Sequence, residues 1–310
     1  MAESLSTYEE QYRHCCVCPR ACGADRLSGD LGVCKAPAEL YLGRAALHWW
    51  EEPCLVGDKG SGAVFFSYCP MGCVYCQNED LVAGAGVAVG FEQFKKTLLR
   101  LQNEEGAANI NLVTPSHYVP TIAAALHSLK EWEQLHVPVV YNTSSYDSVD
   151  SLRMLQGLVD IYLADFKYAS SDIAQKLSHA ANYPSVALAA LDEMVDQITD
   201  WEENDQGLLK RGIIVRHLVL PGHIEESFRV LKVLHERYED KIRLSIMNQY
   251  TPLRGNLVRY GLEERVSSGE YEQVLDYADF LGIENYFWQE GGAASDSFIP
   301  AFDGTGVISN

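Results

Sequence analysis

Hydrophobic residues follow two kinds of spacing from about residue 61 onward. Short apolar runs bounded by polar or turn residues predict buried strands, whereas apolar residues three and four positions apart predict helices. The first spacing predicts strands at 62–68, 109–114, 137–143, 160–166, 212–220, 242–250 and, as a short last one, 284–289. The second spacing predicts helices at 91–102, 121–132, 148–157, 170–178, 184–204, 224–238 and 270–282.

This alternation of strands and helices predicts an α/β fold with a parallel sheet. The turn after the first strand lacks the glycine fingerprint of dinucleotide-binding sheets, which favours a partial (β/α)6 barrel similar to a TIM barrel. In barrels the chemistry lies on the loops that follow the strands. We therefore expect functional residues directly after positions 68, 114, 143, 166, 220 and 250.

Residues 1–60 differ from the rest because they contain few periodic segments and many cysteines. We expect a small cysteine-rich N-terminal module at 1–60 and a barrel with a C-terminal extension at 61–310. Four thiols of the module suit a tetrahedral zinc site or a second iron–sulfur cluster, and the choice between the two stays open. The ligands expected for this second metal are Cys15, Cys18, Cys22 and Cys34, with Cys16 spare.

The 310 residues include 24 Lys and Arg against 43 Asp and Glu, a formal net charge of −19. A surface this negative repels phosphate backbones and anionic lipids, so we expect neither a nucleic-acid nor a membrane partner. No apolar run approaches the roughly 20 residues of a membrane span, and the N-terminus lacks the apolar core of a signal peptide. We expect a cytoplasmic protein, in which thiols stay reduced and clustered cysteines indicate metal or redox chemistry.

Three further cysteines, Cys69, Cys73 and Cys76, follow the first predicted barrel strand with the spacing CxxxCxxC, and Tyr75 precedes the last of them. Three thiolates on one loop can hold three corners of a four-iron, four-sulfur (4Fe-4S) cluster and leave one iron open to a small ligand. The alternatives are a zinc knuckle or three unrelated core cysteines.

This loop resembles the signature of the radical S-adenosylmethionine (SAM) superfamily. Its continuation Cys76-Gln77-Asn78 is similar to the branch of pyruvate formate-lyase activating enzyme homologues. The other segments that carry this resemblance are 18–22, 111–120, 139–152, 159–168, 215–223 and 247–252.

The resemblance implies a 4Fe-4S cluster on the three barrel cysteines, with SAM chelated at the open iron. The reduced cluster would cleave SAM to methionine and a 5′-deoxyadenosyl radical, and the radical would abstract hydrogen from a substrate. It further implies a protein or peptide substrate, as in activases of glycyl radical enzymes, and an electron donor such as flavodoxin or ferredoxin. The protein supplies binding, orientation and exclusion of competing reactions.

The resemblance also assigns polar residues after the later strands to SAM. Asp165 and Lys167 would bind its carboxylate end, unless they only pair with each other. Asn142 and Ser144 would contact its methionine end, unless they only cap the next helix. Neighbouring strand residues point to opposite faces, so only one of Arg216 and His217 faces the interior. The resemblance favours Arg216, because the activases keep an arginine in the equivalent segment, and it implies that Asp165, Lys167 and Arg216 are the catalytic residues.

Three further positions complete the expected site. Tyr75 would lie near the adenine, unless it only packs within its loop, and Gln249 would lie near the ribose or adenine. The segment Thr114 to His117 departs from the Gly-Gly-Glu pattern usual in the family. His117 is therefore either a site group or a loop histidine.

Two other functions stay open. One is radical SAM modification of a different peptide or small molecule. The other is a non-catalytic iron–sulfur protein that binds a partner.

Overall fold

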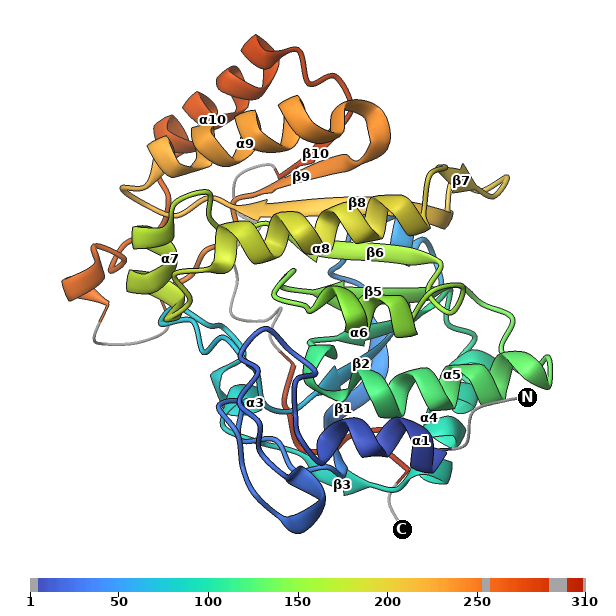
Figure 1. The fold of residues 1–310 in the computed structure, drawn as a ribbon. Helices are drawn as coiled ribbons and strands as arrows, with labels where there is room; N and C mark the ends of the chain where they lie inside the picture. The colour runs from blue at the N-terminus through green and yellow to red at the C-terminus, as the bar shows by residue number, and fades with distance from the viewer. Residues whose placement is uncertain (1–4, 253–256, 290–299, 309–310) are drawn as a thin grey trace.

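The computed structural model describes residues 5–252, 257–289 and 300–308. One sheet dominates it, with the strand order β10-β9-β8-β6-β5-β4-β2-β1-β3 (Figure 1). The strands from β2 to β10 in this order are parallel to their neighbours. Because β3 and β10 are its two edges, the sheet is a partial barrel, as the alternation predicted. The parallel strands are β2 (Ser61–Phe66), β4 (Ile110–Val113), β5 (Val139–Thr143), β6 (Ile161–Asp165), β8 (Leu209–Leu218), β9 (Arg243–Met247) and β10 (Tyr286–Trp288).

Two short helices, Pro53–Val56 and Glu79–Val82, place Leu55 and Leu81 against one face of the sheet. The longer helices connect the parallel strands and lie together on the opposite face (Figure 1). They bury apolar stripes against it: Phe94, Leu98 and Leu101 of one helix are fully buried, as their spacing predicted. Burying each such side chain contributes roughly 1.5–3 kcal/mol to folding. The helices are α4 (Phe91–Asn103), α5 (Val119–Glu131), α6 (Val149–Met154), α7 (Ser171–Ser178), α8 (Tyr183–Gln197), α9 (Ile224–Tyr238) and α10 (Ser268–Leu281), and shorter ones are α1 (Leu5–Glu9), α2 (Pro53–Val56) and α3 (Glu79–Val82).

One predicted helix is shorter than expected. The helix expected at 184–204 begins as predicted, with Pro184 in its first turn, but ends at Gln197. The chain becomes extended at Ile198, and β7 (Glu202–Glu203) pairs with β8 instead of continuing the helix. Pairing with the neighbouring strand β8 therefore decided the structure of this segment, although its apolar residues have helical spacing.

The pattern also did not predict β1 (Leu40–His48), which lies inside the range expected for the N-terminal module. This strand pairs antiparallel with β2 on one side and with β3 (Val87–Val89) on the other. The C-terminal segment 300–308 runs beside it, since the backbone of Gly304 donates to Gly43 and that of Ala45 donates to Thr305. Both ends of the chain thus complete one side of the barrel.

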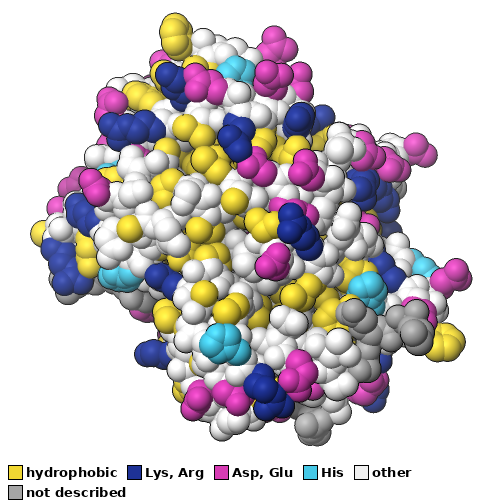
Figure 2. Space-filling view, viewed as in Figure 1, with side chains coloured by type: hydrophobic (Ala, Val, Ile, Leu, Met, Phe, Trp, Pro, Cys, Tyr) yellow, Lys and Arg dark blue, Asp and Glu magenta, His cyan; other side chains and the backbone are white. Residues whose placement is uncertain are grey.

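Charged side chains of both signs are interspersed over the face shown in Figure 2, where Asp and Glu side chains form no single field. None of the helices in the described part of the chain has the length and apolar character needed to cross a bilayer.

Candidate functional site

A cavity of about 250 Å³ lies at the carboxyl ends of the parallel strands. This is the edge at which barrel chemistry is expected. The structure brings ten of the candidate residues together in its lining; their roles as ligands stay predictions. The ten are Cys69, Cys73, Tyr75, Cys76, Asn142, Ser144, Asp165, Lys167, Arg216 and Gln249.

The chain leaves several strands at this edge through unusual backbone. Tyr68, Thr114 and Ser145 follow β2, β4 and β5 with φ of 72°, 61° and 60°. Residues other than glycine rarely adopt such values, and those that do cluster at functional sites. Gly72 has φ of 66° within the cysteine loop, a conformation that glycine adopts without steric cost.

The three barrel thiols share this edge and influence one another. Burial raises the pKa of Cys69 and then the neighbouring Cys73 raises it further, while burial and the other two thiols raise the pKa of Cys76 to about 12. Lys167 opposes both shifts, so a positive charge lies close to the sulfurs. In the described ranges no group of three or more His, Cys, Asp or Glu side chains is arranged to hold a metal ion.

Hydrogen-bond donors nevertheless point at the sulfurs. The backbone N–H of Met71 lies 3.4 Å from Cys69 Sγ, and the hydroxyl of Ser178 donates to Cys73 Sγ at 2.9 Å. Soft thiolates, O–H and N–H donors to sulfur and a nearby lysine are the surroundings that iron–sulfur clusters use. The residues present therefore fit a cluster at this loop.

Ser178 also links the cysteine loop to two tyrosines. Its hydroxyl lies 2.7 Å from Tyr168 Oη, which lies 2.6 Å from Tyr75 Oη. Ser178 is fully buried, and both tyrosines are less than one-tenth exposed. Tyr75 is thus held both by its loop and by a hydrogen-bond chain that ends on a candidate cluster ligand.

A network of charged groups also lines this cavity. Arg216 donates to Asp165 Oδ1 at 2.8 Å, to Glu51 Oε2 at 3.0 Å and to Asn142 Oδ1 at 2.7 Å. Lys167 donates to Asp165 Oδ2 at 2.7 Å. Each of these two half-buried cations thus has a carboxylate partner, which offsets the cost of removing its charge from water.

This pairing sets the protonation of the network. Burial alone would raise the pKa of Asp165, but Arg216 and Lys167 outweigh it and hold that pKa below its usual value. Burial would lower the pKa of Lys167, yet Asp165 raises it, so the ammonium stays charged. An ammonium has three N–H donors, and the bond to Asp165 uses one of them. Lys167 can therefore also bind a carboxylate ligand.

The two histidines considered in the sequence lie away from the cavity. His217 is on the face of β8 opposite Arg216, where its ring nitrogens lie 2.9 Å from Phe166 O and 2.9 Å from Ser227 Oγ. His117 is buried with Nε2 2.8 Å from Ser67 O, and burial lowers its pKa to about 3. The expectation that Arg216 faces the interior is thus confirmed, and His117 is a packed loop histidine.

Sequence reasoning missed Glu51, whose side chain is 6% exposed and lines the cavity. It follows β1, and it accepts hydrogen bonds from Asn111 at 3.0 Å and Asn142 at 3.3 Å as well as from Arg216. The adjacent carboxylates of Glu51 and Glu52 before Pro53 are visible in the sequence, but nothing local shows that they reach the barrel mouth.

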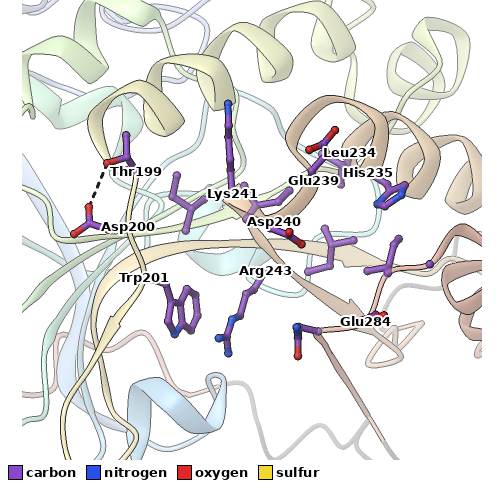
Figure 3. Close-up of a pocket in the computed structure, with 16 residues that line it drawn as sticks. Thr199, Asp200, Trp201, Leu234, His235, Glu239, Asp240, Lys241, Arg243 and Glu284 are labelled. Atoms are coloured by element: carbon purple, nitrogen blue, oxygen red, sulfur yellow. Dashed lines mark hydrogen bonds between the residues drawn. The ribbon is translucent and has the colours of Figure 1, made fainter.

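A second, larger cavity of about 570 Å³ lies at the amino ends of β9 and β10 (Figure 3). There the guanidinium of Arg243 lies 3.9 Å from the ring centroid of Trp201. The cavity contains none of the candidate cysteines and lies at the end of the barrel associated with stability rather than chemistry. Its size therefore does not make it the candidate active site.

Comparison with known proteins identifies one relative by sequence and a solved structure with a similar fold. No family model matches the chain. "Uncharacterized protein MJ0674" of Methanocaldococcus jannaschii is 25% identical over 283 residues, which cover 88% of this chain and 76% of that protein. The fold is similar to that of a radical SAM methyltransferase from Sphaerobacter thermophilus, with a TM-score of 0.52, 14% identity, and coverage of 75% of this chain and 67% of that one.

Streptococcus suis SuiB bound to S-adenosylmethionine is a weaker structural neighbour, with a TM-score of 0.48 and 14% identity over 73% of this chain and 46% of that one. A likeness at that level carries no conclusion. The stronger match places this chain in the partial-barrel fold that a radical SAM methyltransferase has, and it leaves the chemistry to be argued from the cavity.

Proposed function

We propose that this chain is a radical SAM enzyme whose active site is the cavity at the carboxyl ends of the parallel strands. The observation that carries the proposal is that Cys69, Cys73 and Cys76 line one cavity together with Asp165 and Lys167. The three cysteines would hold a four-iron cluster, which would supply the electron for reductive cleavage of SAM.

The residues of the chain bind and orient the reactants. Lys167 pairs with the carboxylate of SAM through its remaining donors, while Asp165 keeps that lysine charged and in place. Arg216 does not have to meet SAM, because three neighbouring oxygens already accept its N–H groups; it fixes Asp165 and Asn142 instead. Tyr75 forms the aromatic wall beside the cysteine loop.

The size of the cavity bears on the substrate. The cavity of about 250 Å³ is small for a ligand pocket, so a substrate bound together with SAM has to reach the reacting carbon from the opening. Trp50, which lines the cavity and is 59% exposed, lies where such a substrate would approach. A polypeptide segment presented at the mouth fits this geometry, and activase-like hydrogen abstraction from a protein is the form of the reaction that we propose.

The test is made on anaerobically reconstituted protein. We expect the electron paramagnetic resonance (EPR) spectrum of the dithionite-reduced cluster to change when SAM is added, and 5′-deoxyadenosine to accumulate. A cluster that forms but neither responds to SAM nor yields 5′-deoxyadenosine would refute the enzyme and favour a non-catalytic iron–sulfur protein. With a glycyl radical enzyme as partner, a radical signal on that partner separates the activase from a modifying enzyme.

A further inference from the structure

Arg26, in the N-terminal part of the chain, is a buried cation with an unusual set of partners. It is 2% exposed. Its guanidinium donates to the carbonyl oxygens of His117 at 2.7 Å and Pro37 at 2.5 Å, and it lies 4.2 Å from the ring centroid of Tyr12. Its Nε is buried and has no hydrogen-bond partner in the part of the chain that the structure describes. None of these contacts supplies a negative charge.

Buried charges in proteins are paired with an opposite charge or coordinate a metal, because an uncompensated buried ion is costly. A group that can become an anion lies beside Arg26: its Nη1 is 3.9 Å from Cys15 Sγ. Arg26 is therefore aimed at the cysteine group of the N-terminal region, and it would be paired if those thiols were thiolates.

The backbone brings these cysteines together. Cys15 is joined to the turn at Gly23 and Ala24 by two backbone hydrogen bonds of 3.0 and 3.1 Å. The thiol of Cys22 lies against Gly32 so closely that a Cβ there would be 2.3 Å from its sulfur, and Cys34 follows two residues later.

The thiol of Cys22 lies 3.9 Å from the carbonyl oxygen of Cys15. Tight turns hold the other two cysteines, since the N–H of Ala21 donates to Cys18 O at 2.9 Å and the N–H of Lys35, next to Cys34, donates to Gly32 O at 3.0 Å. Cys16 is exposed. Cys15, Cys18 and Cys34 are buried, whereas Cys22 is exposed. Four of the five cysteines in this region thus form one group at the surface of the module.

We propose that Cys15, Cys18, Cys22 and Cys34 bind a metal as four thiolates and that Arg26 balances the charge of this centre. Binding one Zn²⁺ releases four thiol protons and leaves a net charge of two minus, and a four-iron cluster on four thiolates is likewise an anion. The side chains have to rotate toward a common point as the metal binds. The proposal does not depend on the reaction at the barrel cavity.

The same centre would support the candidate cluster loop. Arg20 lies between Cys18 and Cys22, and it donates to Pro70 O at 2.8 Å and to His179 O at 2.8 Å. Pro70 is inside the barrel cysteine loop, and His179 follows the serine that bonds Cys73. A metal that holds the two flanking cysteines would fix Arg20 against this loop.

The experiment uses the full chain with Cys69→Ala, Cys73→Ala and Cys76→Ala combined, so that the barrel loop cannot hold metal. Zinc, iron and sulfide are measured after anaerobic purification, and Zn²⁺ is then titrated into stripped protein against a chromophoric chelator. We expect about one zinc, or about four iron and four sulfide, per chain. Iron with sulfide assigns a cluster, and zinc without sulfide assigns a single ion.

Variants on this background test the ligands and the charge. Cys18→Ser should abolish stoichiometric binding and Cys16→Ser should leave it unchanged. Arg26→Gln should weaken Zn²⁺ binding about ten-fold or more, whereas Arg26→Lys should recover most of the affinity. The matched control is Arg13→Gln, which removes an exposed arginine paired with Glu10. Circular dichroism of each variant excludes loss of folding as the cause.

A chain that binds no metal under these conditions would overturn the site, and equal losses in Cys16→Ser and Cys18→Ser would overturn the ligand set. Unchanged affinity in Arg26→Gln would overturn the charge balance. Co²⁺ added to the background chain gives a second measurement, since four thiolates produce intense sulfur-to-metal absorption. Assay of 5′-deoxyadenosine with the unsubstituted chain reports on the barrel reaction separately, so the two proposals fail in distinguishable ways.

Discussion

The barrel cavity and the N-terminal cysteine group each contain cysteines beside a buried arginine, but the two arginines have different partners. Arg216 is bonded to the carboxylates of Asp165 and Glu51, whereas Arg26 contacts carbonyl oxygens and aromatic rings. The charge of Arg216 is therefore already balanced by carboxylates of the protein, and this network forms without a ligand. Among the described residues no carboxylate pairs with Arg26, so thiolates of the neighbouring cysteines would be its counter-charge.

The largest expected effect is on the barrel side of this comparison. Cys73→Ser should abolish the cluster and all cleavage of SAM, because the loop supplies three cysteines and the cluster needs each of them. Visible absorption and 5′-deoxyadenosine formation measure the loss. The matched control is Cys54→Ser, a half-buried cysteine that does not line the cavity. Wild-type cleavage in Cys73→Ser would show that the cluster is held elsewhere.

The two arginines can be compared directly in metal-free protein. Arg216→Met should lower the free energy of unfolding by about 3–5 kcal/mol, since it leaves the carboxylate of Glu51 without its cation and Asp165 with Lys167 alone. Arg26→Met should cost less, about 1–3 kcal/mol, since it leaves only carbonyl acceptors without a donor. Urea denaturation followed by circular dichroism measures both. An equal or larger cost for Arg26→Met would contradict the difference drawn between the two sites.

His217, on the face of β8 opposite Arg216, should have a smaller effect, which is on the pH dependence of the free energy of unfolding. Burial is the main reason that the pKa of His217 falls from 6.5 to about 4, so the folded protein keeps this ring neutral. The unfolded chain takes up a proton below pH 6.5, and stability is therefore lost as pH falls from about 6.5 to about 4. The contribution of His217 is about 1.4 kcal/mol per pH unit.

Unfolding free energies at pH 7, 6 and 5 test this assignment. His217→Gln should show a slope that is shallower than that of the unsubstituted chain by about this amount. Identical slopes would mean that His217 is already protonated in the folded state. Arg216, its neighbour in the strand, stays charged throughout this range because it is paired.

The smallest expected effect concerns the hydroxyl on Cys73. Ser178→Ala removes the donor at 2.9 Å from this sulfur and should lower the reduction potential of the cluster, because hydrogen bonds to sulfur stabilise the reduced state. A redox titration followed by EPR measures the shift. Ser185→Ala removes an exposed hydroxyl that bonds only a nearby carbonyl, so its potential should match that of the unsubstituted chain. Equal potentials in the two variants would show that Ser178 does not tune the cluster.

Much of the fold and the site could be predicted from local signals. The periodicity of apolar residues predicted every parallel strand of the barrel, because each such strand buries its own short run. The rule that barrel chemistry follows the strands, together with the family resemblance, selected ten residues that line one cavity. The end of α8 and the strand β1 were not predicted, because both are decided by pairing with another strand, which the apolar spacing within the segment does not encode.

The sequence by itself determined the strand and helix order, the cysteine spacing and the polar residues at the strand ends, because these features depend on neighbours within a few positions. Only the tertiary structure decided that Glu51 meets Arg216, that Ser178 meets Cys73 and that Arg26 lies beside Cys15 without a carboxylate. The first two pairs are 165 and 105 residues apart in the chain. Contacts between residues so far apart in the chain depend on which strands become neighbours in the sheet. The local pattern of apolar and polar residues does not encode that order.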